Sequence, residues 1–256
     1  MQKILLFSGQ ILLLLVLNLY LNQANLEQVQ AEVPQTAFSA VLHSAPEFKK
    51  TIFPAQDFYE IQILDRQAEI RQVLDTLPLE HLSSLQKIAK PSFASDRRAL
   101  ASDRSIYLNL DLIKSERELR RVLIHEVGHV LDLGKLKARE KMKASEFKDG
   151  SQIIYETDES LDFYRICWES STQMKVNCQS TDFPSLYAQT DVFEDFAESY
   201  LLFVENQQAF KLMAESSAAM QAKYNFFRQI FGDEKIQTGL YQGFQADKRV
   251  WDLTLL

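Results

Sequence analysis

The most informative segment of this chain is SERELRRVLIHEVGHVLDLG, from Ser115 to Gly134, which we expect to form a helix. Its first four residues form a capping box, in which Ser115 caps the amide of Glu118 and Glu118 reaches back. Gly134 stands where a left-handed C-terminal cap is expected. Between these ends, apolar residues recur at helical spacing and form one face: Leu119, Val122, Leu123, Val127, Val130 and Leu131.

This helix carries a possible zinc site, His125-Glu126-Val127-Gly128-His129. Positions four apart lie one turn above each other on a helix, so His125 and His129 can present two imidazoles to one metal ion. Glu126 follows the first histidine, and its carboxylate can reach a water molecule on that metal and act as a general base. Two histidines with such a base are typical of zinc metallopeptidases. The alternative is a surface helix whose histidines bind nothing.

Upstream of this helix, residues 106–112 alternate apolar and polar side chains, which predicts a half-buried strand. We expect this strand to lie at the edge of a small sheet, where an extended peptide substrate could pair with it. Residues 65–77 and 192–232 are expected to be mainly helical, and residues 135–185 irregular. The predicted fold class is therefore α+β, mainly helical with a small sheet whose edge strand precedes the metal-binding helix.

The third metal ligand is expected to be a carboxylate downstream of the motif. Catalytic zinc usually takes three protein ligands, and no histidine follows His129. The other histidines, His43 and His81, are expected to be ordinary, partly exposed side chains. Glu194 and Glu198 stand four apart on one helical face, where two acids repel each other unless a cation lies against them. We expect Glu194 to bind the metal and Glu198 to accept a hydrogen bond from a ligating histidine, although a solvated acidic face is the alternative.

The two blocks, residues 125–129 and 185–198, resemble the anthrax lethal factor-like group of zinc peptidases, which includes secreted endopeptidases that cut beside prolines. In that group a Tyr stands seven residues before the ligand Glu and a further acid four after it, as Tyr187, Glu194 and Glu198 do here. The resemblance implies a zincin-like domain in which Tyr187 donates a hydrogen bond to the oxyanion of the tetrahedral intermediate. Without the resemblance, Tyr187 would be an ordinary core or rim aromatic.

The N-terminus has the features of a secretory signal peptide. Lys3 precedes an apolar stretch from Ile11 to Leu17, and Val29-Gln30-Ala31 supplies a small-residue cleavage site. We expect residues 1–31 to be the signal and residues 32–256 to form a single domain. Residues 4–21 could alternatively serve as an uncleaved anchor. The protein is therefore expected to be exported, periplasmic or secreted, and to contact a membrane only if this segment is retained.

Charge and cysteine content limit the partners and the compartment. The formal net charge is −7, and the acidic residues are weakly clustered, which argues against nucleic acid and anionic membranes as partners. Cys167 and Cys178 are the only two cysteines, and an isolated pair in an exported chain predicts a disulfide. Two free buried thiols are the alternative.

These observations together predict an exported zinc-dependent endopeptidase that acts on proteins or peptides and binds one Zn²⁺ per chain. The expected ligands are His125, His129 and Glu194; Glu126 is the expected base, and Tyr187, by resemblance, the oxyanion donor. Two other classes stay open. One is a zinc-holding binding or assembly protein that does not hydrolyse, against which the presence of both Glu126 and Tyr187 counts. The other is a helical structural protein with a chance motif, which metal analysis would distinguish.

Overall fold

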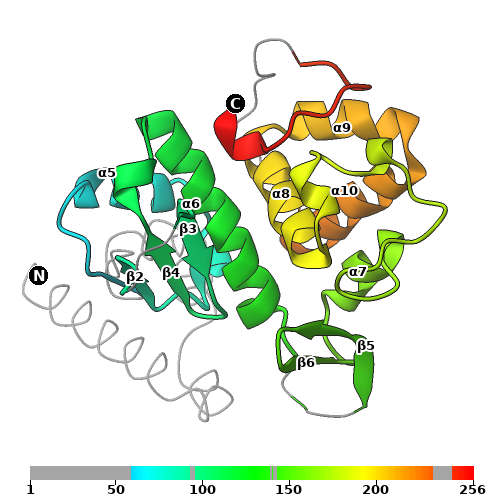
Figure 1. Cartoon of the computed structure of the whole chain (residues 1–256), viewed down its shortest axis with the longest axis horizontal. Helices are drawn as coiled ribbons and strands as arrows, with labels where there is room; N and C mark the ends of the chain where they lie inside the picture. Colours follow the sequence, from blue (N-terminus) through cyan, green and yellow to red (C-terminus); the bar gives the residue numbers. More distant parts are fainter. Residues whose placement is uncertain (1–58, 93–95, 139, 141–142, 233–243) are drawn as a thin grey trace, which may run out of the picture. The chain divides into compact units, whose positions relative to one another are not determined.

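Helix α6 (Glu116–Val130) carries the motif and lies at the centre of the fold (Figure 1). The computed structural model describes residues 59–92, 96–138, 140, 143–232 and 244–256. The predicted capping box is present, because Ser115 Oγ accepts a hydrogen bond from the Glu118 amide at 3.0 Å and Glu118 Oε2 accepts one from the Lys114 amide at 2.8 Å. Every apolar residue of the predicted face is buried, so this face of α6 belongs to the core.

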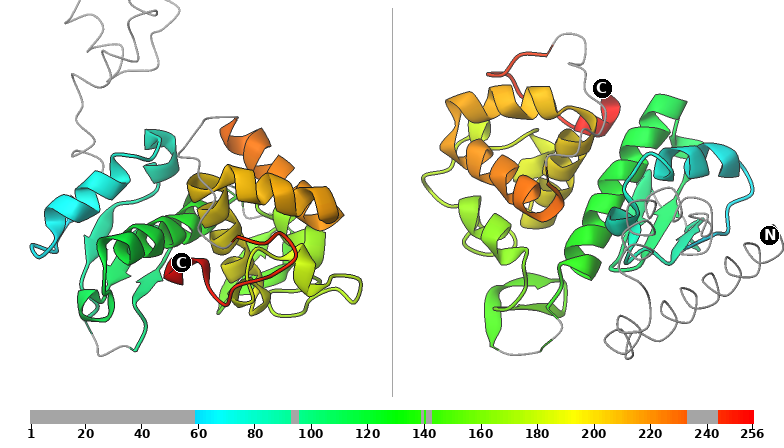
Figure 2. Two further views of the ribbon diagram at one scale, coloured as in Figure 1. Left: turned by 90° about the horizontal axis from the view of Figure 1, so that it is seen from above. Right: turned by 180° about the vertical axis from the view of Figure 1, so that it is seen from behind.

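A four-stranded sheet packs on one side of α6 (Figures 1 and 2). Its strands are β1 (Glu60–Ile61), β2 (Lys87–Ala89), β3 (Ala99–Ala101) and β4 (Ser105–Leu108), in the order β1-β2-β4-β3. The pairs β1–β2 and β2–β4 are parallel, whereas β3 and β4 are antiparallel.

The strand that precedes α6 is therefore an interior strand, and the expected edge position of residues 106–112 is wrong. The reason is a tight turn in which Ser102 Oγ accepts hydrogen bonds from the amides of Arg104 and Ser105, folding β3 back onto β4. The predicted strand also ends early, because the residues after Asn109 form the 3-10 turn η4 (Leu110–Leu112), in which the Leu112 amide donates to the Asn109 carbonyl at 3.1 Å. The open edge of the sheet on this side belongs to β3.

Three helices lie on the other side of α6: α8 (Val192–Glu205), α9 (Gln207–Ser216) and α10 (Ala218–Phe231). Each begins at a residue whose side chain accepts hydrogen bonds from backbone amides of the first turn, namely Asp191, Asn206 and Ser217. The helical prediction for residues 192–232 is confirmed. Aromatic rings from these helices interlock in the core, among them Phe196, Phe203, Tyr200, Phe227 and Phe231.

The remaining segments complete the α+β class, which is confirmed for the described residues. Helix α5 (Gln67–Leu74) lies within the predicted helical segment 65–77, and the 3-10 turn η3 (Leu79–Leu82) follows it. Residues 135–185 were expected to be irregular, but they contain a hairpin of β5 (Ala144–Asp149) and β6 (Gln152–Tyr155) and then helix α7 (Leu161–Cys167). Short 3-10 turns follow α7 and end the chain: η6 (Ser180–Asp182), η7 (Tyr187–Gln189) and η8 (Leu253–Leu255).

Two glycines allow α6 to approach its neighbours closely. A Cβ on Gly128 would lie 3.0 Å from the Ala197 Cα and 3.2 Å from Tyr200 Cδ1, so this glycine lets α6 and α8 come together. After Val130, α6 continues into the π-helical turn η5 (Leu131–Lys135). The expected left-handed cap at Gly134 is wrong, because its φ is not positive; a Cβ there would lie 2.2 Å from the Asp103 carbonyl oxygen. Gly134 is therefore required because a side chain at this position would collide with the backbone of Asp103.

The described residues, 59–256 with the gaps given above, cluster as one compact unit. The predicted signal or anchor, residues 1–31, and His43 lie outside the described residues. Within the part of the chain that the structure describes, no helix has both the length and the hydropathy required to cross a bilayer.

Candidate metal centre

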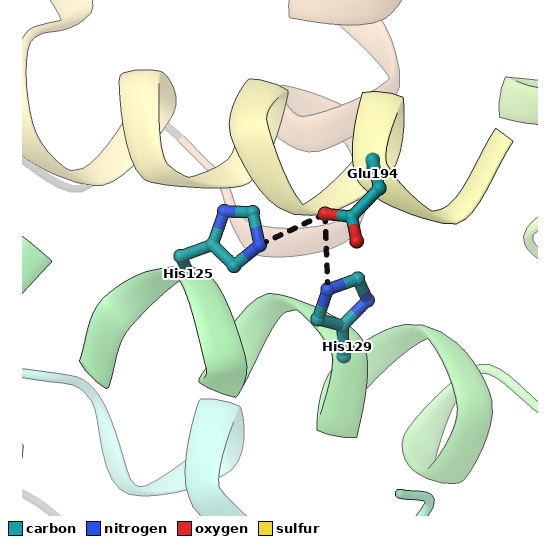
Figure 3. Close-up of side chains that lie close together, drawn as sticks. All are labelled: His125, His129 and Glu194. Atoms are coloured by element: carbon teal, nitrogen blue, oxygen red, sulfur yellow. Dashed lines mark hydrogen bonds and ion pairs between the residues drawn. The ribbon is translucent and has the colours of Figure 1, made fainter. Parts of the chain in front are cut away.

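His125 and His129 lie one turn apart on α6, as their spacing requires, and face α8 (Figure 3). Their ring centroids are 4.9 Å apart with the planes at 79°, so the two rings meet edge to face. The two side chains are only 6% and 12% exposed. Two largely buried imidazoles held at this distance can share one cation.

Glu194 comes to these imidazoles from the first turn of α8 (Figure 3). Asp191 Oδ1 caps this helix by accepting hydrogen bonds from the amides of Phe193 and Glu194, both at 2.9 Å, which places Glu194 at the start of the helix. Glu194 Oε2 lies 3.1 Å from His125 Nε2 and 3.5 Å from His129 Nε2. One ligand atom from each of these three residues lies within 4.8 Å of the others. The structure thus brings the three predicted ligands to one point.

The electrostatics of this cluster favour a positive charge between the three side chains. Burial by itself would lower the pKa of His125, but hydrogen bonds to Glu194 and Glu198 raise it well above its ordinary value. Burial would likewise raise the pKa of Glu194, yet the hydrogen bonds from His125 and His129 hold it far below its usual range. A cation at this position would be stabilised by the carboxylate, and two nitrogens with one carboxylate oxygen form a donor set that suits Zn²⁺.

Glu198 lies one turn after Glu194 and is fully buried behind His125. Its Oε1 is 3.1 Å from His125 Nδ1. This carboxylate oxygen accepts a hydrogen bond when Nδ1 carries the ring proton. A histidine protonated at Nδ1 can use Nε2 as its ligand atom, and Nε2 is the atom that faces Glu194. Glu198 thus stands in the place predicted for a carboxylate that fixes the tautomer of a ligating histidine.

Glu126 lines the same cavity as the three clustered side chains. Its side chain is buried, and no described group forms a hydrogen bond to its Oε2. Burial raises the pKa of this carboxyl. A buried carboxylate oxygen without a partner is costly unless something in the cavity donates to it, as a water molecule or a substrate amide would.

Tyr187, in the 3-10 turn η7, places its hydroxyl against Glu194. The phenol donates a hydrogen bond to Glu194 Oε1 at 2.9 Å, and its ring lies 6.2 Å from that of His125. Burial, followed by the nearby charge of Glu194, raises the pKa of Tyr187 far above its ordinary value, so the hydroxyl keeps its proton. The structure therefore brings this residue to the cluster, where the family resemblance of the second block implies that it lies.

The cavity that contains this cluster has a volume of about 540 Å³. Strand β3 lines one wall through Ala99, Leu100 and Ala101, and α6 lines another. Residues of the chain's last segment also line it, namely Trp251, Asp252 and Thr254. This last segment holds no motif and no periodic pattern, so the sequence alone assigns it no role. Only its apolar composition, with Trp251 among leucines, could have drawn attention to it.

Two other predicted features lie away from the cavity. Cys167 and Cys178 stand at disulfide distance, with Cα atoms 5.7 Å apart, at the end of α7 and in the loop after it. The expectation that His81 is partly exposed is wrong: it is 1% exposed, its Nδ1 lies 2.8 Å from the Tyr200 hydroxyl, and its ring packs on Phe231. It lies in the core because η3 packs against α6, and it does not belong to the cluster of Glu194.

Comparisons of this chain with protein-family models, with curated proteins and with solved structures find no match.

Proposed function

We propose that this protein is an exported zinc-dependent endopeptidase with a zincin-like domain, akin to the lethal factor-like peptidases. One observation carries this proposal: the ligand atoms of His125, His129 and Glu194 converge in a cavity that Glu126 also lines with an unpartnered carboxylate oxygen. A structural metal site is usually closed by four protein ligands, whereas three ligands with a neighbouring base are typical of a catalytic one.

The three clustered side chains would hold the metal, and Zn²⁺ bound there would supply Lewis-acid chemistry toward a peptide carbonyl and a water molecule. Glu126 Oε2 would take the proton of the attacking water and deliver it to the nitrogen of the departing amine. Tyr187 would turn its hydroxyl hydrogen from Glu194 toward the carbonyl oxygen of the substrate as negative charge develops there. Glu198 would keep the proton on His125 Nδ1 throughout.

The open edge of β3 would bind the substrate. Strand β3 pairs with β4 on one side only, and its residues Ala99, Leu100 and Ala101 line the cavity. An extended peptide could therefore add to the sheet through backbone hydrogen bonds and pass its scissile bond over Glu126. Small side chains at Ala99 and Ala101 leave room for this backbone to approach.

The alternative is a protein that holds zinc for binding or assembly without hydrolysis. Such a protein has no need to bury an unpartnered carboxylate beside its metal ligands, because that oxygen costs about 1–3 kcal/mol when it lacks a partner. The unpartnered Oε2 of Glu126, in a residue that lines the cavity, together with the hydroxyl of Tyr187, favours the peptidase.

The test is cleavage of a peptide library by zinc-loaded protein, with products identified by mass spectrometry. Glu126→Gln keeps the size of the side chain but cannot accept a proton, so we expect it to retain zinc and to lose cleavage by about 10³-fold or more. Glu116→Gln is the matched control, since Glu116 is an exposed acid on the same helix. No cleavage by the zinc-loaded wild type, or equal cleavage by Glu126→Gln, would overturn the peptidase proposal.

A further inference from the structure

The last residues of the chain, 250–256, pass beside the cluster of His125, and we call them the C-terminal strap. The strap accepts hydrogen bonds from the segment that carries Tyr187: the Leu186 amide donates to the Val250 carbonyl at 2.9 Å, and the Tyr187 amide donates to the Trp251 carbonyl at 2.7 Å. The strap also donates one, because the Leu253 amide lies 3.0 Å from Glu198 Oε2.

Glu198 is thereby held from two sides. Its Oε1 meets His125 Nδ1 at 3.1 Å and its Oε2 meets the Leu253 amide at 3.0 Å. Because this carboxylate is fully buried, water cannot replace either partner. The position of Glu198, and with it the orientation of the His125 ring, therefore depends on the backbone of the strap.

Arg98 holds the strap against the rest of the fold, and Asp252 shapes the turn of the strap. Arg98, next to β3, pairs with Asp252 at 2.5 Å and with Glu118 of the α6 capping box at 3.0 Å. Asp252 Oδ1 accepts hydrogen bonds from the amide and the hydroxyl of Thr254, at 2.7 and 2.5 Å, which starts the turn η8 (Leu253–Leu255). The Asp252 and Leu253 side chains are almost fully buried, and η8 packs against α6 and α8.

We propose that the C-terminal strap is a positioning element of the metal centre: the Leu253 amide orients Glu198, which orients His125, and the Trp251 carbonyl holds the backbone of Tyr187. The inference rests on the proposed function, since it assumes that His125 binds a metal ion. None of the strap residues is assigned a chemical step. Their contribution is to metal affinity, because loss of an outer partner of a ligating histidine typically lowers that affinity 10–100-fold.

Leu253→Pro tests this contact directly. Leu253 is the first residue of η8, a position that tolerates proline, and Asp252 before it has φ −149° and ψ 125°, which is the conformation that proline favours in its predecessor. The substitution therefore removes one N–H, and that N–H donates to Glu198. Leu253→Ala is the matched control, because it loses the side chain and keeps the amide.

The readout is the dissociation constant for Zn²⁺, measured by competition with a chelator, alongside the unfolding temperature of the zinc-free protein. We expect Leu253→Pro to bind zinc at least about tenfold more weakly than Leu253→Ala. Equal affinities of these two variants, both folded, would overturn the proposal. If Leu253→Pro does not fold, Asp252→Asn decides: it weakens the Arg98 contact at constant size, and an unchanged zinc affinity would count against the strap.

A double-mutant cycle with Glu198→Gln adds a test that a merely structural role would not pass. A carboxylate accepts a hydrogen bond at both oxygens, whereas Gln has one acceptor and must set its NH₂ against either His125 Nδ1–H or the Leu253 amide. In the Leu253→Pro background this conflict is gone, so Glu198→Gln should cost at least about fivefold less affinity there than in the wild type. Additive losses would contradict the proposal.

These outcomes separate the strap from the peptidase proposal. A wild type that binds zinc in this site but cleaves nothing would overturn the peptidase and leave the strap supported by the affinities. A wild type that cleaves peptides, with Leu253→Pro and Leu253→Ala equal in zinc affinity, would overturn only the strap.

Discussion

At the scale of single residues, the hydrogen bond from the Tyr187 hydroxyl to Glu194 links the turn η7 to the cluster of His125. The Tyr187 hydroxyl lies 2.9 Å from Glu194 Oε1, so this hydroxyl is close to any group that Glu194 helps to bind. If it stabilises the oxyanion, its loss falls on the transition state and not on substrate binding.

We therefore expect Tyr187→Phe to lower kcat by about 10²–10³-fold with KM little altered, at unchanged zinc content. Tyr155→Phe on β6 is the control, since that phenol lies outside the cavity lining. Steady-state kinetics on one cleaved peptide make the comparison. A rate for Tyr187→Phe within a few-fold of the wild type would show that this hydroxyl has no part in the reaction.

His81 is the residue whose titration should be visible in stability. Burial, with the nearby charge of Lys135, lowers its pKa from 6.5 to about 3. Between these two values the unfolded chain binds a proton that the folded one does not, so the folded state loses stability as the pH falls below 6.5. The loss approaches about 1.4 kcal/mol per pH unit for one such group.

We expect His81→Asn to lose less stability than the wild type between pH 6.5 and pH 4.5, because the amide does not titrate. Urea unfolding of zinc-free protein at the two pH values measures this, and the difference between the two proteins cancels all other titrating groups. Parallel losses in the two proteins would mean that His81 is protonated in the folded state.

The residues of the cluster differ in how far the sequence could predict their placement. The four-residue spacing of His125 and His129 is local helical geometry, and both lie together as that spacing requires. Glu194 and Glu198 could be predicted from the same four-residue spacing, and because two acids on one helical face repel each other unless a cation lies against them. The partner of Glu198 on its other side, the Leu253 amide, could not be predicted, because it depends on how a segment without periodicity returns to α6.

At the scale of elements, the close approach of α6 and α8 brings Glu194 to the two imidazoles. Gly128 allows it, since a Cβ there would lie 3.0 Å from the Ala197 Cα. Helix propensity favours Ala over Gly by up to about 1 kcal/mol, but an extra carbon in a tight helix contact typically costs about 1–3 kcal/mol.

We expect Gly128→Ala to move α8 outward by a few tenths of an ångström, to lower the stability of the zinc-free protein and to weaken zinc binding. Thermal unfolding and chelator competition report the two effects separately. If Gly128→Ala raises the unfolding temperature and binds zinc as the wild type does, helix propensity alone governs this position and the contact is not tight.

The elements also show why the sheet was only partly predicted. The alternation of residues 106–112 indicates a strand, but whether it lies inside the sheet or at its edge depends on neighbours that are distant or weakly patterned. Strand β3 has only Ala99, Leu100 and Ala101, too few residues for a pattern, yet it takes the edge. The helices were easier to predict, because side-chain caps and periodic apolar faces are written within one segment.

At the scale of the whole molecule, the cluster of His125, His129 and Glu194 joins the two halves of the described fold. Helix α6 packs on the sheet and supplies His125 and His129, whereas α8 belongs to the helical group and supplies Glu194 (Figures 1 and 3). An ion held by both helices would bind the folded state and not the unfolded chain, so it would stabilise the fold by about 4 kcal/mol when its concentration exceeds the dissociation constant a thousandfold.

We claim that these three side chains form one zinc site, and elemental analysis of zinc-loaded, desalted protein measures its occupancy. We expect about one zinc per chain in the wild type and in Glu116→Gln, and little or none in His125→Ala and Glu194→Ala, with all four proteins folded. A wild type that takes up no zinc, or a Glu194→Ala protein that keeps its full zinc content, would contradict the claim.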